Sequence, residues 1–265
     1  MRSALGSLLL VFCLAEVSVA QSSLRVHRDT DGKVTRVHLG GKSSSDRLTT
    51  TLGSISAIAK LKSVQSVTLS FATVDDAMIQ PLLGMQDLVY LDLRFSDVTG
   101  ESIAMLAELP KLRILLLDNC DVRDDHLVAL AKMPQLNGLS LERTKVTSRG
   151  LKHIGQLKEL VDLNLQACDI DDVGLASMGH FPQIRSLFLT KSMRYGRDDR
   201  VDLTDKSIDY LASLSTLTDL RIGSTKITDV GIAKLKLALP QARIDTAESG
   251  ILQIGGKRPD ATAKH

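Results

Sequence analysis

Apolar residues recur along most of the chain at a fixed interval of 24 positions. Five of them each open a similar phrase of apolar and polar residues: Leu88, Leu112, Leu136, Leu160 and Ile184. In Leu88-Val-Tyr-Leu91-Asp-Leu93 the apolar and polar residues alternate towards the end, which predicts a short strand with one buried face. Ten residues further on, apolar residues recur three apart, as in Ile103, Leu106 and Leu109, which predicts a short helix.

Each unit is therefore expected to form one strand, a turn and one helix that leads back to the start. A single strand of this length cannot bury its apolar face, so successive strands must stack in parallel at ~4.8 Å and share one core. Thr or Asp stands just before each helix and suits a helix N-cap. We expect the paired carboxylates Asp75-Asp76, Asp124-Asp125 and Asp171-Asp172, which fall at these helix starts, to be structural.

The strand pattern and the helix pattern, which keep the same period of 24 residues, together resemble a leucine-rich repeat protein over residues 34 to about 245. The phrases Ile170-Asp-Asp-Val-Gly174-Leu175 and Ile227-Thr-Asp-Val-Gly231-Ile232 are similar to the cysteine-containing class of these repeats. That class occurs in substrate-recognition subunits of F-box ubiquitin ligases and in many exported bacterial proteins. The ending Leu235–Ile244 resembles the closing half-repeat of the bacterial group, and no stretch outside the repeats is large enough for an F-box. The resemblance implies an α/β fold, a right-handed solenoid or horseshoe with a parallel concave sheet and short convex helices.

Departures from the period give the expected domain boundaries. A short apolar run and the small residues Ser18-Val19-Ala20 predict a signal peptide over 1–20 and export to the periplasm or the extracellular space. A single domain over 21–245 follows, and its parts are an N-terminal cap and partial repeat (21–63), full repeats (64–239) and a closing half-repeat (240–245). The turn signal Thr30-Asp31-Gly32 predicts a hairpin in the cap, and we expect 246–265 to be a disordered tail.

Composition excludes several function classes. Leu accounts for 44 residues whereas aromatic residues make up 3% of the chain, which disfavours a sugar-binding cleft lined with rings. The formal net charge of +2 gives no electrostatic reason to expect nucleic acid or an anionic membrane as a partner. No segment after the signal is apolar over the ~18 residues that a membrane span needs.

The residues with reactive side chains do not assemble into a catalytic motif. Cys120 and Cys168 are 48 positions apart, or two repeats, so they should lie about 10 Å from each other and remain free thiols. His126, His153 and His180 are 27 apart and form no column across the repeats. The chain also has no Gly-x-Ser-x-Gly and no phosphate-binding glycine loop. We therefore expect no enzyme activity, no metal and no cofactor.

The outward positions of the strands are the best candidates for a binding surface, because core packing does not dictate them. Tyr90, Ile114 and Leu116 should form a small apolar patch beside an acidic strip of Asp118, Glu142 and Asp162. Exposed apolar residues flanked by charge are typical of protein-binding hot spots, although ordinary β propensity explains the same residues. Three further outward residues complete the candidate set: Asp92, Arg94 and Phe188.

A second candidate is the insertion at 193–202, which adds nine residues to the interval between Ile184 and Leu217. Insertions in repeat proteins fall in loops along one edge, where ligands often bind. This one contains four residues of types enriched at hot spots: Arg194, Tyr195, Arg197 and Arg200. A solvated loop of mixed charge is the alternative.

These observations predict an exported, monomeric, non-catalytic module that binds an unknown protein or peptide or acts as a scaffold. Two alternatives stay open. A hydrolase would use carboxylates of the concave face and would need a raised pKa near Asp118 or Glu142. A structural component of the cell envelope would self-associate edge to edge.

Overall fold

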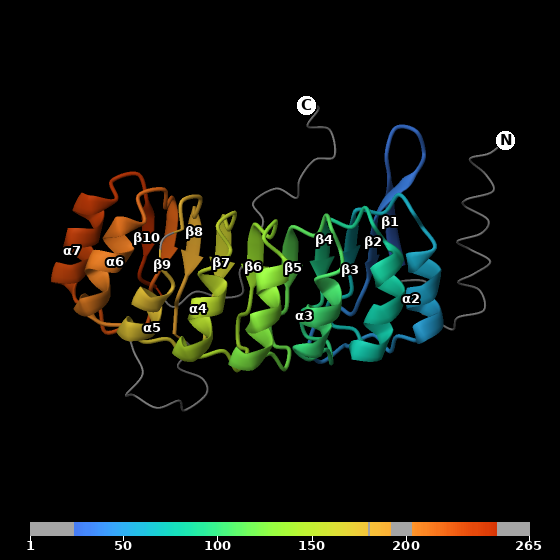
Figure 1. The fold of residues 1–265 in the computed structure, drawn as a ribbon, viewed down its shortest axis with the longest axis horizontal. Coiled ribbons are helices and arrows are strands. Elements are labelled where there is room, and N and C mark those ends of the chain that lie inside the picture. The colour runs from blue at the N-terminus through green and yellow to red at the C-terminus, as the bar shows by residue number, and fades with distance from the viewer. Residues whose placement is uncertain (1–23, 180, 192–202, 248–265) are drawn as a thin grey trace.

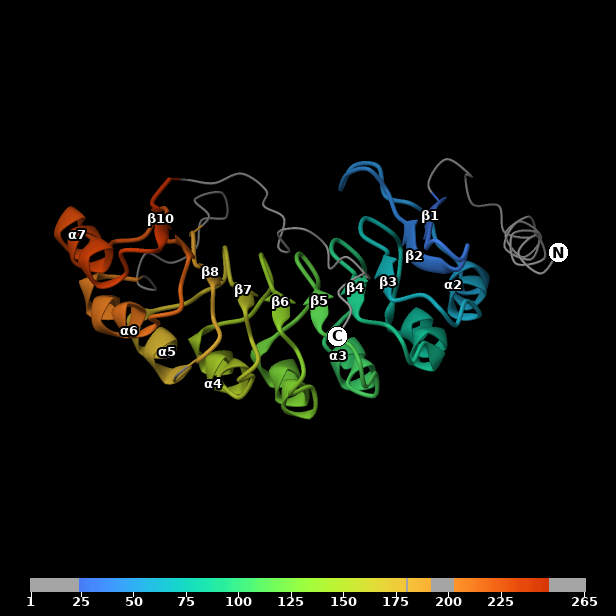
Figure 2. The same ribbon diagram turned by 90° about the horizontal axis from the view of Figure 1, so that it is seen from above.

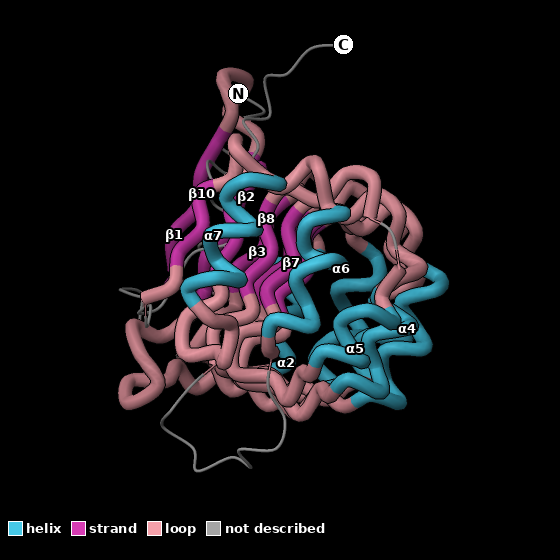
Figure 3. Tube along the Cα trace, turned by 90° about the vertical axis from the view of Figure 1, so that its left-hand side faces the viewer, coloured by secondary structure: helices cyan, strands magenta, loops and turns pink. Residues whose placement is uncertain are grey.

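The computed structural model describes residues 24–179, 181–191 and 203–247. Within them the strands form one open sheet in which every strand lies next to its neighbours in chain order, from β1 to β10. The strands line one side of an arc and the helices line the other (Figures 1 and 2). A view along the arc shows the two layers separated, with strands on one side and helices on the other (Figure 3). The fold is a right-handed α/β leucine-rich-repeat solenoid, as the resemblance implied.

The strands of the repeats are short and occupy equivalent places in successive units. They are β3 (Ser66–Thr68), β4 (Tyr90–Asp92), β5 (Ile114–Leu116), β6 (Gly138–Ser140), β7 (Asp162–Asn164), β8 (Ser186–Phe188), β9 (Asp219–Arg221) and β10 (Arg243–Asp245). All are parallel, and the pairing register follows the period, so that Tyr90 lies beside Ile114 and Ile114 beside Gly138. The longer interval leaves this register intact, because Ser186 pairs with Asp219.

The convex layer contains both α-helices and 3-10 helices. The α-helices are α2 (Leu52–Ala59), α3 (Glu101–Leu106), α4 (Leu151–Ile154), α5 (Asp172–Ser177), α6 (Ile208–Ser213) and α7 (Asp229–Ala238). The 3-10 helices are Asp76–Gly84, Asp124–Lys132, Ser148–Gly150 and Asp205–Ser207. Side-chain oxygens cap several helix starts as expected; Asp75 accepts from the Met78 N–H and Asp171 from the Gly174 N–H.

The N-terminal end of the stack begins with a hairpin. Strand β1 (Leu24–Arg28) pairs antiparallel with β2 (Val34–Leu39), and β2 then pairs parallel with β3. Gly32 has a φ of 78° in the connecting turn, a conformation that glycine adopts without steric cost. The hairpin therefore occupies the end of the sheet where the sequence predicts a cap.

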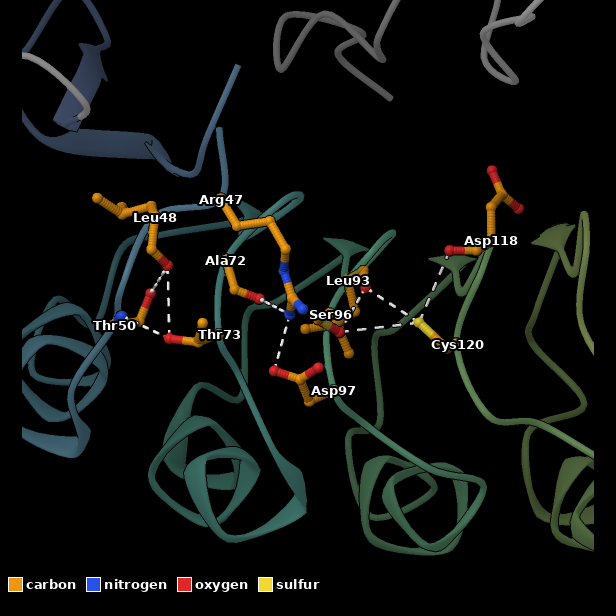
Figure 4. A network of polar contacts seen from close by, with 10 residues as sticks. All are labelled: Arg47, Leu48, Thr50, Ala72, Thr73, Leu93, Ser96, Asp97, Asp118 and Cys120. Atoms are coloured by element: carbon orange, nitrogen blue, oxygen red, sulfur yellow. Dashed lines mark hydrogen bonds and ion pairs between the residues drawn. The ribbon is translucent and has the colours of Figure 1, made fainter. Parts of the chain in front are cut away.

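The extra residues of the first unit extend the sheet edge. Leu48 donates its N–H to the Phe71 carbonyl at 2.8 Å and accepts from the Thr73 N–H at 2.9 Å. Arg47 reaches the Ala72 carbonyl at 3.2 Å and the Asp97 carboxylate at 2.7 Å (Figure 4). The loop thus contacts two successive repeats rather than projecting away from them.

One apolar core runs the length of the solenoid. The inward residues of each phrase are almost fully buried, as Leu88, Leu91 and Leu93 are at 0% exposure. Each repeat contributes the same few inward positions to this narrow core, so the abundance of Leu follows from the repetition. Phe181 is a fully buried aromatic residue of the main cluster, and the partly buried Tyr210 packs against that cluster.

Candidate protein-binding face

The concave side of the sheet carries three parallel columns of outward side chains. The first contains Tyr90 and Ile114, the second Asp92 and Leu116, and the third lies just beyond the strand ends. Figure 2 shows this side as the inner face of the arc. Because strands are ~4.8 Å apart, each outward side chain contacts its counterparts in the preceding and following repeats.

Apolar residues on this face form a cluster of their own, separate from the main core. Tyr90, Leu116 and Phe188 are its buried members, and Ile114 is partly buried against them. The predicted patch of Tyr90, Ile114 and Leu116 is therefore brought together, and Phe188 joins it. The guanidinium of Arg221 lies 4.5 Å from the centre of the Phe188 ring, a cation–π contact.

The prediction that this patch is exposed is wrong. Tyr90 is 8%, Leu116 1% and Phe188 5% exposed. The polar residues of the middle column are equally inaccessible, with Ser140 and Asn164 at 0%. Strand alternation identified the side of the sheet correctly but carried no information about how far that side is covered.

Two of the three members of the predicted acidic strip, Asp118 and Glu142, are buried, and so is Asp92, a candidate residue outside the strip. Asp92, 1% exposed, forms a bidentate ion pair with Arg94 at 2.9 and 2.7 Å. Glu142, 6% exposed, pairs with Arg143 at 2.8 Å, and Asp162 is only half-buried. The strip was inferred from carboxylates alone, without the arginine that pairs with Glu142.

Asp118 lies at the centre of this face and is 4% exposed. Its Oδ1 accepts a short hydrogen bond from the Ser140 hydroxyl and another from the Glu142 N–H at 3.1 Å. Burial raises the pKa of Asp118 to about 7, against hydrogen bonding from Ser140 and the charge of Arg94, which lower the pKa. Arg94 is half-buried; burial alone would lower its pKa, but the bond to Asp92 raises it above its usual range.

The sequence analysis did not pair Asp92 with Arg94 or Asp219 with Arg221, although their spacing indicates both ion pairs. Asp92 and Arg94 are two positions apart, as are Asp219 and Arg221, and alternate strand residues share a face. Arg221 pairs with Asp219 at 3.2 Å while contacting the Phe188 ring. An acidic and a basic residue two positions apart on a strand therefore indicate an ion pair on the concave side.

The insertion candidates Arg194, Tyr195, Arg197 and Arg200 lie outside the described residues, as does His180. In the part of the chain that the structure describes, no group of three or more His, Cys, Asp or Glu side chains could hold a metal ion. Across residues 24–179, 181–191 and 203–247, no helix is long and apolar enough to cross a bilayer.

Cys120 and Cys168 are free, buried thiols, in line with the spacing argument. Each donates to a carbonyl of the preceding repeat, Cys120 to Leu93 at 3.2 Å and Cys168 to Leu141 at 3.1 Å. The Ser96 hydroxyl donates to the same Leu93 carbonyl at 2.6 Å (Figure 4). Burial raises the pKa of Cys120 to about 12, so this thiol is a structural donor rather than a nucleophile.

The carboxylates at the helix starts connect neighbouring repeats. Asp76 accepts from the Thr99 N–H at 2.9 Å and from its hydroxyl at 2.7 Å, and Asp172 accepts from the equivalent groups of Thr204 at 2.8 and 2.6 Å. We expected these aspartates to be structural because each would cap the start of its own helix. These aspartates instead bind the cap residue of the following repeat.

The comparisons with known proteins agree with this architecture. The family model described as Leucine Rich repeat matches residues 158–179 and 213–236. Among solved structures, the chain is similar to an internalin (inlF) from Listeria monocytogenes, with a TM-score of 0.52 and 20% sequence identity. That alignment covers 74% of this chain and 57% of the internalin chain. No curated protein sequence matches.

At 20% identity the internalin likeness shows the fold alone. Two segments match the family model, and the same 24-residue register runs from β3 to β8. The matched segments and the fold together support a leucine-rich repeat architecture for this chain.

Proposed function

We propose that this protein is a non-catalytic protein-binding or scaffold module whose concave face contacts a protein or peptide ligand. The apolar cluster of Tyr90, Ile114, Leu116 and Phe188 carries the proposal. These side chains lie outside the main core, so the solenoid does not need them to bury its inward leucines. Aromatic side chains are enriched at protein-binding hot spots, and the half-buried Ile114 leaves the edge of this cluster accessible to a ligand.

The charges around the cluster support selective rather than bulk electrostatic binding. Arg94 and Arg221 are each held by a carboxylate two positions earlier, at 2.7 and 3.2 Å. Guanidinium groups fixed in this way present oriented donors with little entropy to lose on binding. The same pairing keeps the face near neutrality, in line with the formal net charge of +2.

Substitution of Leu116 by Glu tests the proposal. A charge in the middle of the cluster should abolish capture of the partner from the source cells' envelope fraction, as measured by quantitative mass spectrometry. Leu237→Glu is the matched control, because Leu237 lies on convex helix α7 and is 84% exposed. Ile114→Glu at the half-buried edge of the cluster repeats the test with less risk to the fold. Partner capture unchanged in folded Leu116→Glu and Ile114→Glu proteins would contradict the proposal.

The insertion at 193–202 is proposed as a second contact region, on the evidence of its position in the repeat and its content of Arg194, Tyr195, Arg197 and Arg200. Deletion of residues 193–201 should weaken capture of the same partner. Full capture by the deletion variant would remove the insertion from the binding surface.

Export is part of the proposal and rests on the signal-like segment 1–20. We propose a periplasmic or extracellular location and a monomeric state. Analytical sedimentation over a range of concentrations tests the monomer, and concentration-dependent growth would favour a self-associating envelope protein instead.

A hydrolase is the second candidate, because the raised pKa of Asp118, about 7, is what that alternative required. Asp118 is nevertheless 4% exposed and accepts hydrogen bonds from Ser140 and Glu142, an arrangement that favours a structural role. Any hydrolytic activity of the purified protein that is lost in a folded Asp118→Asn variant would favour the enzyme.

A further inference from the structure

The first strand of the N-terminal hairpin places two basic side chains on the concave face. Leu24 and Val26 of β1 pack against the main core, so the alternating residues Arg25 and His27 lie on the concave side. Both side chains are exposed. Within residues 24–179, 181–191 and 203–247, no hydrogen bond or ion pair holds either of them. Their charge and their donors are therefore available to a ligand.

Strand β2 supplies two more basic side chains to the same face. Arg36 and His38 pair with Ser66 and Thr68 of β3, whose side chains belong to the outward columns of the sheet. Arg36 and His38 are half-buried. The hairpin stands at the blue end of the sheet in Figure 1, so the four residues lie at the N-terminal end of the concave face.

The register of the hairpin sets these basic residues against each other. Arg25 lies opposite His38, and His27 lies opposite Arg36. Opposite residues of an antiparallel pair have Cβ atoms about 5 Å apart, and residues two apart on a strand are separated by about 7 Å, so the four form one cationic patch. An acidic partner would stabilise the hairpin at either place, whereas two basic residues repel each other or, with a neutral imidazole, gain no attraction. Folding of the cap therefore does not account for the patch.

Carboxylates of this region lie away from the cationic patch. Asp29 belongs to the hairpin turn, where its Oδ1 accepts from the N–H groups of Asp31 and Lys33 at 3.0 and 2.9 Å. Among the described residues of the outward columns, the first carboxylate after the patch is Asp92 on β4, which Arg94 holds at 2.7 Å. This end of the face is thus locally basic, although the formal net charge of the chain is only +2.

The first outward column changes its chemistry along the sheet. It leads from His27 and Arg36 through Tyr90 and Ile114 to Asp162 on β7. The column is thus basic at one end, apolar in the middle and acidic at the other end. With strands ~4.8 Å apart, β1 and β5 are separated by about 19 Å, a distance that about six residues of an extended peptide span. A ligand that complements the column is acidic at one end and apolar after it.

We propose that the cationic patch binds an acidic peptide segment of the protein ligand, with at least two Asp or Glu side chains, and that the following residues of the ligand continue over Tyr90 and Ile114. The guanidinium groups of Arg25 and Arg36 supply paired donors to carboxylates, and the two imidazoles supply further N–H donors. Asp162 repels the acidic end of the ligand, so the charges also set its direction. That the ligand is a protein rests on the proposed function, whereas the preference of the patch for carboxylates does not.

A peptide of six glutamates tests the patch without the natural ligand. The full chain should bind hexaglutamate in isothermal titration calorimetry at low salt, and the affinity should fall as salt is raised. Arg25→Glu with Arg36→Glu should weaken binding at least about tenfold. Lys60→Glu with Lys62→Glu is the matched control, because it changes the net charge equally at exposed residues after convex helix α2. The control should bind within about twofold of the wild type.

Arg25→Gln with Arg36→Gln separates binding from stability. The double substitution removes the opposed basic groups, so the melting temperature should stay unchanged or rise while the hexaglutamate affinity falls at least about threefold. A lower melting temperature with unchanged affinity would assign the patch to the structure of the cap and overturn the proposal.

Three further results would overturn the proposal. One is equal affinity of the wild type and the Arg25→Glu, Arg36→Glu variant, and another is an equal loss in the Lys60→Glu, Lys62→Glu control. The third is tighter binding of a sulfated oligosaccharide or a single-stranded oligonucleotide of matched charge, lost in the same variant, because the patch would then select another polyanion.

The outcome is separable from that of the proposed function. Hexaglutamate binding together with unchanged partner capture by folded Leu116→Glu and Ile114→Glu proteins would leave the cationic patch and remove the proposed function. Partner capture lost in those variants, with no hexaglutamate binding by the wild type, would leave the proposed function and remove the acidic segment.

Discussion

The Asp124 carboxylate of one repeat accepts two hydrogen bonds from Thr147 of the next, from the backbone N–H at 2.7 Å and from the hydroxyl at 2.6 Å. Asp76 and Asp172 do the same for Thr99 and Thr204. Asp205 repeats the contact in the next unit, where it accepts from the Thr228 N–H at 2.8 Å and from its hydroxyl at 2.7 Å. Stability in a solenoid depends on contacts between neighbouring repeats, and these polar links join the convex edges of successive units.

Asp124→Ala should therefore destabilise the solenoid. It removes two hydrogen bonds and leaves the partly buried Thr147 N–H without its acceptor, at a cost of about 2 kcal/mol in the free energy of unfolding. Urea titration followed by circular dichroism measures the change. Asp125→Ala is the control, since the Asp125 side chain is 79% exposed and its removal should alter stability by less than about 0.5 kcal/mol. Equal losses in the two variants would contradict the link.

The same contacts predict loss of stability in acid. Burial alone would raise the pKa of Asp76 and of Asp172, but hydrogen bonds from Ser102 and Thr99, and from Ser207 and Thr204, lower both pKa values below 3.8. A lowered pKa contributes stability above the unfolded value, and that contribution is lost as pH falls through the folded pKa. Asp76→Asn with Asp172→Asn should flatten the decline of melting temperature below about pH 4. A parallel decline in wild type and variant would rule this out.

Asp118 predicts a pH dependence of opposite sign. Its pKa is raised from 3.8 to about 7, mainly by burial, with Arg94 and Glu142 as the charged groups that face it. Between these values the unfolded chain releases the proton first, so the free energy of unfolding falls as pH rises and levels off above about 7. Asp118→Asn keeps an Oδ1 acceptor for Ser140 and cannot ionise. It should equal the wild type near pH 4 and be more stable by a few kcal/mol near pH 8. A difference that does not vary with pH would contradict the assignment.

The two buried thiols should be inert in the folded protein. Alkylation at pH 8 followed by peptide mass spectrometry should leave Cys120 and Cys168 unmodified in the native state, because the Cys120 pKa is raised to about 12 and both thiols are buried. Both should be modified once the chain is denatured without reductant. A peptide pair joined by a disulfide would contradict the geometry.

Much of the architecture could be predicted because two patterns in the sequence, one for the strands and one for the helices, repeat with the same period. The pairing of Tyr90 with Ile114, and of Ser186 with Asp219 across the insertion, follows from aligning the inward leucines. The N-terminal hairpin was readable from Gly32 in its turn. Local periodicity records which side of an element faces the core, and inward residues repeat with the same spacing as the elements.

Less of the candidate site could be predicted. The position of Leu116 on the concave side was correct, but its burial was not foreseen. Asp118 was predicted to be part of an exposed acidic strip. It is instead buried and accepts hydrogen bonds from Ser140 and Glu142 of the next repeat. Turns after the strands place residues such as Ala167, with a φ of 55°, in a left-handed conformation. The sequence did not indicate this conformation, because these positions are not glycine.

The sequence by itself determined the period, the parallel register, the apolar core and the side of each strand, because these depend on spacings within a repeat and on identical residues one repeat apart. The tertiary structure alone decided which carboxylate binds which hydroxyl, which arginine neutralises which acid, and where Ala247 comes close to Gly223. Those contacts join residues whose distance is set by the curvature and close stacking of the repeats. A linear pattern of polar and apolar positions carries no measure of that distance.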